Sequence, residues 1–390
     1  MRIQTLITSC FILFFSGKLV AQENLPVTRI GIFVSLHLDS TFSDDTTYNF
    51  KEQMPKHILS GLDFSEGAMI GLDSISAAFP IEVSFFDIKS QNQNIQKLIQ
   101  GKIFDSLQLI IGAVTGSDYK QLAEIALSSQ IPFLSSTMPN DGGISQNPFT
   151  ILLNPTIAVH CQGIYKFIAQ TFPKGNIIYI KKKGVQEDKI FNYLQTINQS
   201  NPIRNRINWQ TYTMNDSLNT NDISKMIDTT RQNILICGSL EEKFNVNFLN
   251  MASNLTSSNI HFVGMPVWET LKELQNPKHK RKTIYYSTSF FNDGSEKFNI
   301  FNQKFLSKTN GKPSDIAYKA YDICFNFIHL LIEYNKDFMN RLNDASFNQF
   351  IDYNIQPVKN TSLVKPDYFE NKRVYIIKRS NGTQTKAGNF

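Results

Sequence analysis

The chain has 390 residues, of which 41% are hydrophobic and 18% are charged, and its formal net charge is +6. A chain of this length usually divides its hydrophobic core between two domains. The small net charge, without a concentrated basic footprint, argues against a protein that binds nucleic acid.

The first 21 residues have the pattern of a secretory signal peptide. An apolar stretch from Leu6 to Phe15 follows Arg2, and small residues lead to Ala21 before the chain turns polar. The stretch is too short to cross ~30 Å of hydrocarbon as a helix, and no later segment predicts a transmembrane helix. Cleavage would remove Arg2 and Lys18, so the charge would fall from +6 to +4. We therefore expect a mature protein in the periplasm or another extracytoplasmic space.

Three cysteines follow the signal peptide, Cys161, Cys237 and Cys324, each in an apolar context. A sparse and odd count does not predict a disulfide framework. Buried free thiols are the favoured interpretation. The alternative is that one pair forms a disulfide in an oxidising envelope. Cys10 lies in the middle of the apolar stretch, which is a poor position for the acylated cysteine of a lipoprotein.

From Arg29 onward, short β-branched or aromatic runs alternate with helical stretches, as is typical of α/β domains with parallel strands. The first set predicts strands at 30–34, 81–86, 107–114 and 131–134, and helices at 63–79, 95–99 and 117–127. The polar segment 37–61 has no period and predicts a mobile loop. Asp63 to Glu66 has the pattern of a capping box that would begin the next helix.

The alternation restarts after Pro155 and predicts a second, similar lobe. Its expected strands are 177–180, 209–212, 234–237 and 261–263, with helices at 158–172 and from Glu187; later elements are a strand at 284–290, a helix from 313 to about 333 and a last strand at 374–377. We predict two Rossmann-like lobes with parallel sheets flanked by helices, between which the chain crosses more than once. The N-terminal lobe would comprise 22–154 plus about 286–365, and the C-terminal lobe 155–285 plus about 366–390.

Motifs for catalysis are missing from the sequence. It has no nucleophile elbow, phosphate-binding loop, dinucleotide fingerprint or C-x-x-C pair, and its six histidines show no spacing typical of metal ligands. Gly112 to Gly116 comes nearest to an elbow, but Val114 occupies the place of the nucleophile. The sequence therefore favours a binding protein over an enzyme and predicts no metal and no cofactor.

Hydroxyl-bearing and small residues follow the predicted strands of the first lobe, where open α/β sheets place their ligands. Backbone N–H groups and hydroxyls after the third strand are suited to hold a carboxylate or another anion. Ser117 also fits a helix N-cap, and the group after the fourth strand also fits a polar turn. The candidate ligand-binding residues here are Ser35, Thr115, Gly116, Ser117, Ser135, Ser136 and Thr137.

Two candidates come from the second lobe. Trp268 follows a predicted strand and would either provide a flat wall for a ligand or fill the core. Lys181 begins a run of three lysines, which fits a solvated loop; if Lys181 faces the cleft, it would favour an acidic ligand.

The order of these features resembles the type I periplasmic binding proteins, which include the branched-chain amino acid receptors. The similarity covers residues 28–380 and rests on Phe64-x-x-Gly67-Ala68, Ile110-Ile111-Gly112 followed by hydroxyls, Ile131-Pro132-x-Leu134-Ser135, and Pro313 ahead of Ala320-Tyr321-Asp322. The resemblance implies that Thr115, Ser117, Ser135 and Ser136 take a ligand carboxylate. Glu269 is the nearest substitute for the acid that neutralises the amine, and Lys182-Lys183-Gly184 stands where an aromatic would come. The expected ligand is therefore small and polar or anionic, amino-acid-like or related, and the departures at the second lobe do not favour an ordinary free α-amino acid.

Gly264 to Trp268 and Tyr368 to Tyr375 look like the binding-protein half of Bacteroidetes envelope proteins that often carry a LysM module, although no LysM module is visible here. An envelope interaction protein or scaffold, with a protein or peptidoglycan partner, is therefore the alternative function. For the leading function, the expected partners are a small-molecule ligand and either an inner-membrane transporter or an envelope protein.

Overall fold

The computed structural model describes residues 26–43, 47–50, 54–214, 220–255, 259–359 and 365–390. The expected signal peptide at 1–21 lies outside the described residues and stays a prediction. None of the helices within the described ranges combines the length and the apolar character needed to cross a membrane.

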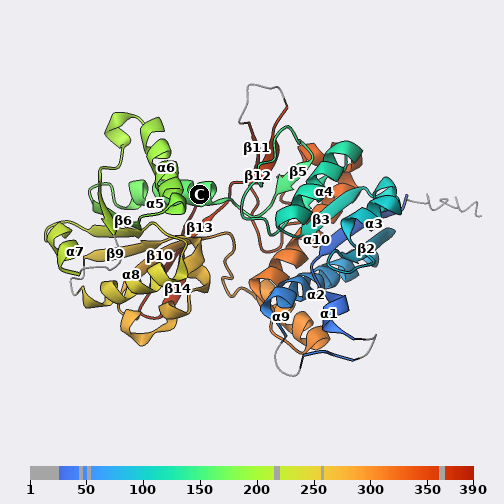
Figure 1. Ribbon diagram of the computed structural model, residues 1–390, viewed down its shortest axis with the longest axis horizontal. Helices are drawn as coiled ribbons and strands as arrows, with labels where there is room; N and C mark the ends of the chain where they lie inside the picture. The colour runs from blue at the N-terminus through green and yellow to red at the C-terminus, as the bar shows by residue number, and fades with distance from the viewer. Residues whose placement is uncertain (1–25, 44–46, 51–53, 215–219, 256–258, 360–364) are drawn as a thin grey trace, which may run out of the picture.

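The described chain folds into two α/β lobes, each built on a seven-stranded sheet (Figure 1). The strand order of the first sheet is β11-β12-β5-β4-β3-β1-β2. All its pairs are parallel except β11 with β12. The bounds are β1 (Thr28–Val34), β2 (Ile81–Asp87), β3 (Leu109–Ala113), β4 (Phe133–Ser135), β5 (Thr150–Leu152), β11 (Ile355–Val358) and β12 (Tyr368–Asn371).

The second sheet repeats this topology in the order β14-β13-β10-β9-β8-β6-β7. Its first five strands in chain order pair in parallel, and β13 pairs antiparallel with β10 and β14. The two similar parallel lobes predicted from the alternation of elements are thereby confirmed. The bounds are β6 (Asn176–Lys182), β7 (Trp209–Met214), β8 (Asn233–Cys237), β9 (Ile260–Gly264), β10 (Thr283–Thr288), β13 (Tyr375–Ser380) and β14 (Thr383–Asn389).

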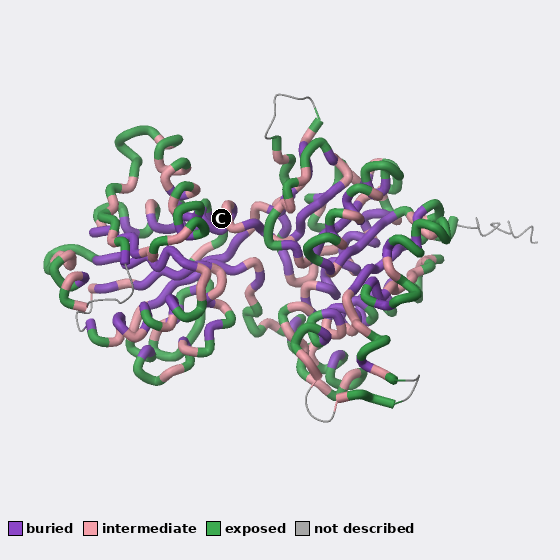
Figure 2. Tube along the Cα trace, viewed as in Figure 1, coloured by how far each residue is buried: buried purple, intermediate pink, exposed green. Residues whose placement is uncertain are grey.

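Helices cover both faces of each sheet, so the central strands are buried on both sides (Figure 2). The helices of the first lobe are α1 (Leu38–Thr41), α2 (Lys56–Ser76), α3 (Ile95–Gln100), α4 (Gly116–Ser129), α9 (Glu296–Thr309) and α10 (Asp315–Tyr334); those of the second are α5 (Ile157–Thr171), α6 (Val185–Ser200), α7 (Thr220–Met226) and α8 (Glu242–Asn254). Short 3₁₀ helices are η1 (Ile103–Ser106), η2 (Ile203–Asn205), η3 (Pro266–Thr270), η4 (Lys272–Gln275), η5 (Pro277–His279) and η6 (Asn335–Asn340). Cys161, Cys237 and Cys324 are buried free thiols.

Helix α2 begins at Lys56, so the prediction of a loop up to residue 61 and a helix start near Asp63 is wrong. The first turns of α2 already bury Ile58 in the core. A Cβ at Gly61 would come within 2.3 Å of the Ser35 carbonyl oxygen. Because only glycine permits this approach, the first turns of α2 pack directly against the carboxyl end of β1.

Three segments of the described chain pass between the lobes: 153–156, 289–295 and 372–374. The first segment is hydrogen-bonded to the end of β12, from which the third segment leaves. The Asn371 side chain donates to the Leu153 carbonyl oxygen (3.1 Å), and the Thr156 N–H donates to Glu370 (3.2 Å). Two predicted domain boundaries move accordingly. Strand β10 belongs to the second sheet and ends at Thr288, so the crossing to the first lobe follows residue 288 rather than about 285. Strand β12 belongs to the first sheet because it pairs with β5, so the return to the second lobe comes after Asn371 rather than near 366.

Candidate functional site

Two neighbouring cavities lie where the carboxyl ends of the strands of the two lobes meet. The first has a volume of about 430 Å³ and the second about 810 Å³, and both are lined by Asn154 and Lys319. Volumes of this size are typical of small-molecule sites. Since the second cavity takes its lining from both lobes, the two cavities together form the candidate cleft.

The first cavity is formed mainly by the first lobe and contains four of the predicted residues, Ser35, Thr115, Ser136 and Thr137. Two of these hydroxyls are already engaged as donors. The Ser136 Oγ donates to the Gly112 carbonyl oxygen (2.9 Å), and the Thr137 Oγ1 donates to the Val114 carbonyl oxygen (3.1 Å). In this arrangement both oxygens retain lone pairs that can accept a hydrogen bond from a ligand. The Thr115 hydroxyl makes neither a capping hydrogen bond to α4 nor another hydrogen bond to a described residue, so it is available to donate or accept.

Three other predicted residues of the first lobe do not line either cavity. Ser135 is completely buried, because it is the last residue of β4 and faces the interior. Gly116 and Ser117 are exposed on the first turn of α4 and belong to the lining of neither cavity. The N-cap of α4 is Thr115, so the alternative of Ser117 as the cap is also wrong.

Trp268 and Lys181 are likewise absent from the cleft lining. Trp268 is fully buried in the second lobe, where its indole N–H donates to Asn245 Oδ1 (2.7 Å), so it fills the core instead of providing a wall for a ligand. Lys181 forms an ion pair with Asp188, and its ammonium lies 5.3 Å from the centre of the Phe191 ring. These local partners hold Lys181 against its own lobe, so it does not face the cleft.

The second cavity brings together residues that are distant in sequence. Pro139 to Gly143 and Lys319 come from the first lobe, whereas His160, Tyr193 and Glu269 come from the second. Tyr193, on α6, lines this cavity, whereas Trp268 does not. Of the predicted residues, only Glu269 lines this cavity.

Lys319 and Glu269 provide opposite charges from opposite lobes. The Lys319 Nζ donates to Ser289 Oγ (2.8 Å), and the Glu269 carboxylate accepts a hydrogen bond from the Thr288 hydroxyl. Neither forms an ion pair with a described residue. Burial raises the pKa of Glu269, while the charge of Lys319 and the Thr288 hydrogen bond oppose that rise. The lining of this cavity therefore contains a cation and a carboxylate that form no ion pair with each other.

His160 is a buried, neutral member of the cavity lining. Its Nδ1 lies 3.0 Å from Ser287 Oγ, and burial, together with the charge of Lys319, lowers its pKa to about 3. The His160 imidazole therefore binds a proton less tightly in the folded state than in the unfolded chain, where its pKa is 6.5. The stability contributed by neutral His160 is full above about pH 6.5 and is lost as the pH falls toward 3.

We expect the His160→Asn variant to remove this pH dependence. Between pH 7 and pH 5, the wild type should lose about 2 kcal/mol more unfolding free energy than the variant. The comparison is needed because burial raises the pKa of Asp322 to about 6, which acts in the opposite direction in both proteins. Urea denaturation at each pH measures the free energy of unfolding. If this free energy changed equally with pH in the two proteins, His160 would not be a buried neutral histidine.

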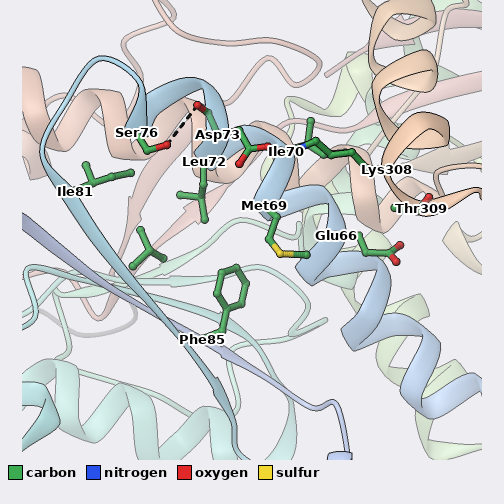
Figure 3. A pocket seen from close by; sticks show the side chains of 11 residues that line it. Glu66, Met69, Ile70, Leu72, Asp73, Ser76, Ile81, Phe85, Lys308 and Thr309 are labelled. Carbon is green, nitrogen blue, oxygen red and sulfur yellow. Dashed lines mark hydrogen bonds and ion pairs between the residues drawn. The ribbon is translucent and has the colours of Figure 1, made fainter. Parts of the chain in front are cut away.

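A further cavity, of about 640 Å³, lies on the outer side of the first lobe between α2, β2 and α9 (Figure 3). Its walls are mainly apolar, with Met69, Leu72 and Phe85 pointing into it. The charged Asp73 on its rim already pairs with Lys308. Its lining therefore contains one carboxylate without a described ion pair, Glu66, and no unpaired cation.

Among the described residues, no group of three or more His, Cys, Asp or Glu side chains is placed to hold a metal ion. The residues that sequence reasoning missed are His160, Tyr193, Asn154 and Lys319. Lys319 had one recognisable signal, because it is the sole lysine in the otherwise largely apolar α10. The others carry no local signal that separates them from ordinary helix or loop residues.

No protein-family model and no curated protein matches this sequence. Solved structures do match it over nearly the whole length. A putative branched-chain amino acid ABC transporter from Rhodospirillum rubrum has 13% identity and a TM-score of 0.67, covering 93% of this chain and 100% of that chain. A branched-chain amino acid ABC transporter periplasmic ligand-binding protein from Burkholderia xenovorans has 10% identity and a TM-score of 0.63, covering 93% and 95%.

An ABC transporter substrate-binding protein from Desulfitobacterium hafniense in complex with Leu has 12% identity and a TM-score of 0.57, covering 93% of this chain and 100% of that chain. At such low identity, these similarities establish the fold and not the ligand. The strand order shared by the two sheets, and the three crossings between the lobes, are consistent with that fold. This chain has the two-lobed fold of the type I periplasmic binding proteins.

Proposed function

We propose that this protein is an extracytoplasmic solute-binding protein that closes its two lobes on a small polar or anionic ligand of the amino-acid-like class. The observation that carries the proposal is the cavity of about 810 Å³ with Lys319 from one lobe and Glu269 from the other. A ligand that contacts both charges binds the closed form more tightly than the open form. Binding therefore shifts the equilibrium toward closure.

The roles of individual residues follow from their free hydrogen-bonding capacity. Lys319 and the Thr115 hydroxyl bind the anionic group of the ligand, since both can donate. Ser136, Thr137 and Glu269 accept from an amine or hydroxyl of the ligand. Tyr193 provides the apolar wall on the second lobe. The protein holds its ligand without transforming it.

Two further parts of the proposal concern location and partner. The signal-peptide pattern at residues 1–21 supports export. The structural neighbours are named as components of ABC transporters, which supports an inner-membrane transporter as the partner that receives the ligand.

The alternative function is an envelope scaffold that keeps this fold and binds a protein or peptidoglycan. It is favoured by the absence of Ser117 and Ser135 from the cleft lining, because the resemblance to amino acid receptors implies that residues at these two positions take the ligand carboxylate. The size of the cavity favours the solute binder, since a scaffold has no need to keep such a volume open.

The deciding experiment measures ligand-induced closure. A panel of amino acids, short peptides, small organic anions and wall fragments is screened by thermal denaturation and small-angle scattering. A true ligand at 100 times its Kd should stabilise the folded state by about 2.7 kcal/mol and reduce the radius of gyration. If a broad panel produces neither change, the clamp function fails and the scaffold becomes the leading function. Native mass spectrometry of protein isolated from its own envelope would weigh a retained ligand directly.

A further inference from the structure

A separate cavity of about 670 Å³ lies in the second lobe, at the amino end of β6. It is bounded by the end of α5, the turn at Pro173 to Asn176 and the segment 201–208. Gln186 and Lys189, which follow the opposite end of β6, line the inter-lobe cleft. Seven residues of strand separate these two ends, which corresponds to roughly 20 Å. The cavity is therefore distinct from the cleft.

The lining of this cavity is strongly basic. It includes five cations and no carboxylate; the cations are Lys166, Lys174, Arg204, Arg206 and Arg231. Of these, only Arg231 forms an ion pair with a described residue, through Asp228 (2.7 Å). A concave surface of one charge sign focuses its potential and attracts counter-ions. The remaining four cations thus have no ion-pair partner among the described residues.

Neutral donors are also available beside these cations. The side-chain amides of Gln170, Asn205 and Asn208 line the cavity and make no hydrogen bond to a described residue. Amide groups of this kind can donate to anionic oxygens that the cations attract. The cavity thus offers both charge and directed hydrogen bonds.

Hydrogen bonds hold the outer wall of the cavity in place. The Asn198 side chain bridges α6 to the wall, since its Nδ2 donates to the Ile207 carbonyl oxygen (3.0 Å) and its Oδ1 accepts from the Ile207 N–H (2.9 Å). Tyr165 donates to the same Oδ1 (2.8 Å). The Arg206 guanidinium donates to the carbonyl oxygens of Asn201 (3.0 Å) and Gln199 (2.7 Å). The segment that carries Arg204 is therefore anchored rather than free.

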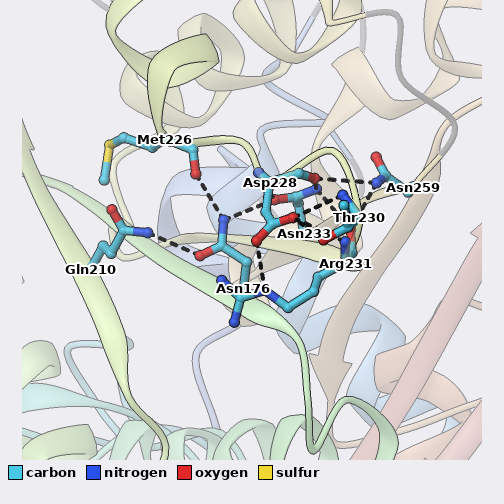
Figure 4. Close-up of polar contacts among 8 residues, drawn as sticks. All are labelled: Asn176, Gln210, Met226, Asp228, Thr230, Arg231, Asn233 and Asn259. Atoms are coloured by element: carbon cyan, nitrogen blue, oxygen red, sulfur yellow. Dashed lines mark hydrogen bonds and ion pairs between the residues drawn. The ribbon is translucent and has the colours of Figure 1, made fainter.

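A polar network adjoins the cavity and includes three of its lining residues, Asn176, Gln210 and Arg231 (Figure 4). Asn176, at the start of β6, donates to the Met226 carbonyl oxygen and to Asn233 Oδ1, both at 2.8 Å, and accepts from Gln210 (2.9 Å). The Asn233 side chain in turn donates to the Asp228 carbonyl oxygen (2.8 Å). The Asp228 carboxylate then orients Arg231, which explains why this arginine is the paired one. Hydrogen bonds from Thr230 and Arg231 hold the pKa of Asp228 well below its usual value.

We infer that this cavity binds a phosphate-bearing ligand. A phosphate group carries close to two negative charges near neutral pH and has three acceptor oxygens. Arginine guanidinium groups match such oxygens with paired donors. A single carboxylate, with one charge, would leave most of the four free cations uncompensated. Soluble phosphate compounds and phospholipid headgroups both carry such a phosphate group, so both classes of ligand fit the site.

The test measures binding of pyrophosphate by calorimetry, and binding of vesicles by co-sedimentation. We expect pyrophosphate to bind the wild type with a Kd below about 1 mM at low salt, and binding to weaken as salt rises. The Lys174→Gln/Arg204→Gln variant should bind pyrophosphate at least about tenfold more weakly, which corresponds to a loss of about 1.4 kcal/mol in binding free energy. Neither of these two side chains makes a hydrogen bond or ion pair to a described residue, so both substitutions should preserve folding.

The matched control is Lys280→Gln/Arg281→Gln, which removes two exposed charges from the same lobe outside the cavity. It should bind as the wild type does; equal weakening by both double variants would overturn the site in favour of general surface attraction. Citrate that binds as tightly as pyrophosphate would overturn the assignment to phosphate. Binding to phosphatidylglycerol vesicles but not phosphatidylcholine vesicles, without binding of pyrophosphate, would identify the lipid source. If neither pyrophosphate nor vesicles bound, the phosphate site would be refuted, independently of any ligand that binds in the inter-lobe cleft.

Discussion

Replacing Trp268 by alanine is expected to lower the free energy of unfolding by about 3–5 kcal/mol, the range for loss of a large buried aromatic. Trp268 is completely buried, and its ring centre lies 5.8 Å from that of Phe248. Its indole N–H donates to Asn245 Oδ1, and Gly264 provides the space for the ring: a Cβ at Gly264 would lie 1.9 Å from it. Denaturant unfolding monitored by circular dichroism measures the loss.

The matched control is Trp209→Ala, because Trp209 is the second tryptophan and is only partly buried on the edge strand β7. Its loss of stability should be clearly smaller. The Trp268→Phe variant should fall between them, since it keeps an aromatic ring and loses the indole hydrogen bond. If Trp268→Ala remained as stable as the wild type and instead lost ligand binding, its assignment to the core would be wrong.

Replacing Lys319 by methionine is expected to weaken binding of an anionic ligand by about 10- to 100-fold, the range for loss of a hydrogen bond to a charged group. Lys319 is half-buried, and its single described hydrogen bond, to Ser289, leaves donors for a ligand. Methionine keeps the length and the apolar stem, so packing beside Phe290 should persist. Calorimetry with the ligand found by screening measures the change.

The same variant should alter the pH dependence of binding. The charge of Lys319 lowers the pKa of Glu269, so its removal lets burial raise that pKa further, and the carboxylate takes up a proton at a higher pH. A ligand amine would then bind less well at mildly acidic pH. Lys319→Arg should retain most of the affinity, and Lys312→Met, an exposed neighbour of α10, should bind as the wild type does. An affinity for Lys319→Met within twofold of the wild type would refute the role of Lys319 in the cleft.

The regular part of the fold could be predicted because its signals are local. Strands such as β1, β3 and β8 are continuous apolar runs, and a strand buried on both faces needs such a run. Helix α10 has an apolar stripe with a polar start at Pro313 and Ser314. The predicted bounds of these elements agree with the structure to within a few residues.

The peripheral elements could not be predicted in this way. Strand β14 is almost entirely exposed, with no alternation of apolar and polar residues, and β12 consists of four residues. Both form because they pair with strands that are already in place. β12 joins β5, more than 200 positions earlier in the chain, which no local pattern can reveal.

The sequence by itself determined the two α/β lobes and the edge of the first sheet where Ser35, Thr115, Ser136 and Thr137 gather, because periodicity and the polar residues after strands are properties of neighbouring residues. Only the tertiary structure decided that Trp268 lies in the core, that Lys181 is held by Asp188, and that Lys319 and Glu269 face one cavity. These outcomes depend on which way each side chain points and on how two lobes come together. Both are set by contacts between segments that are far apart in the sequence.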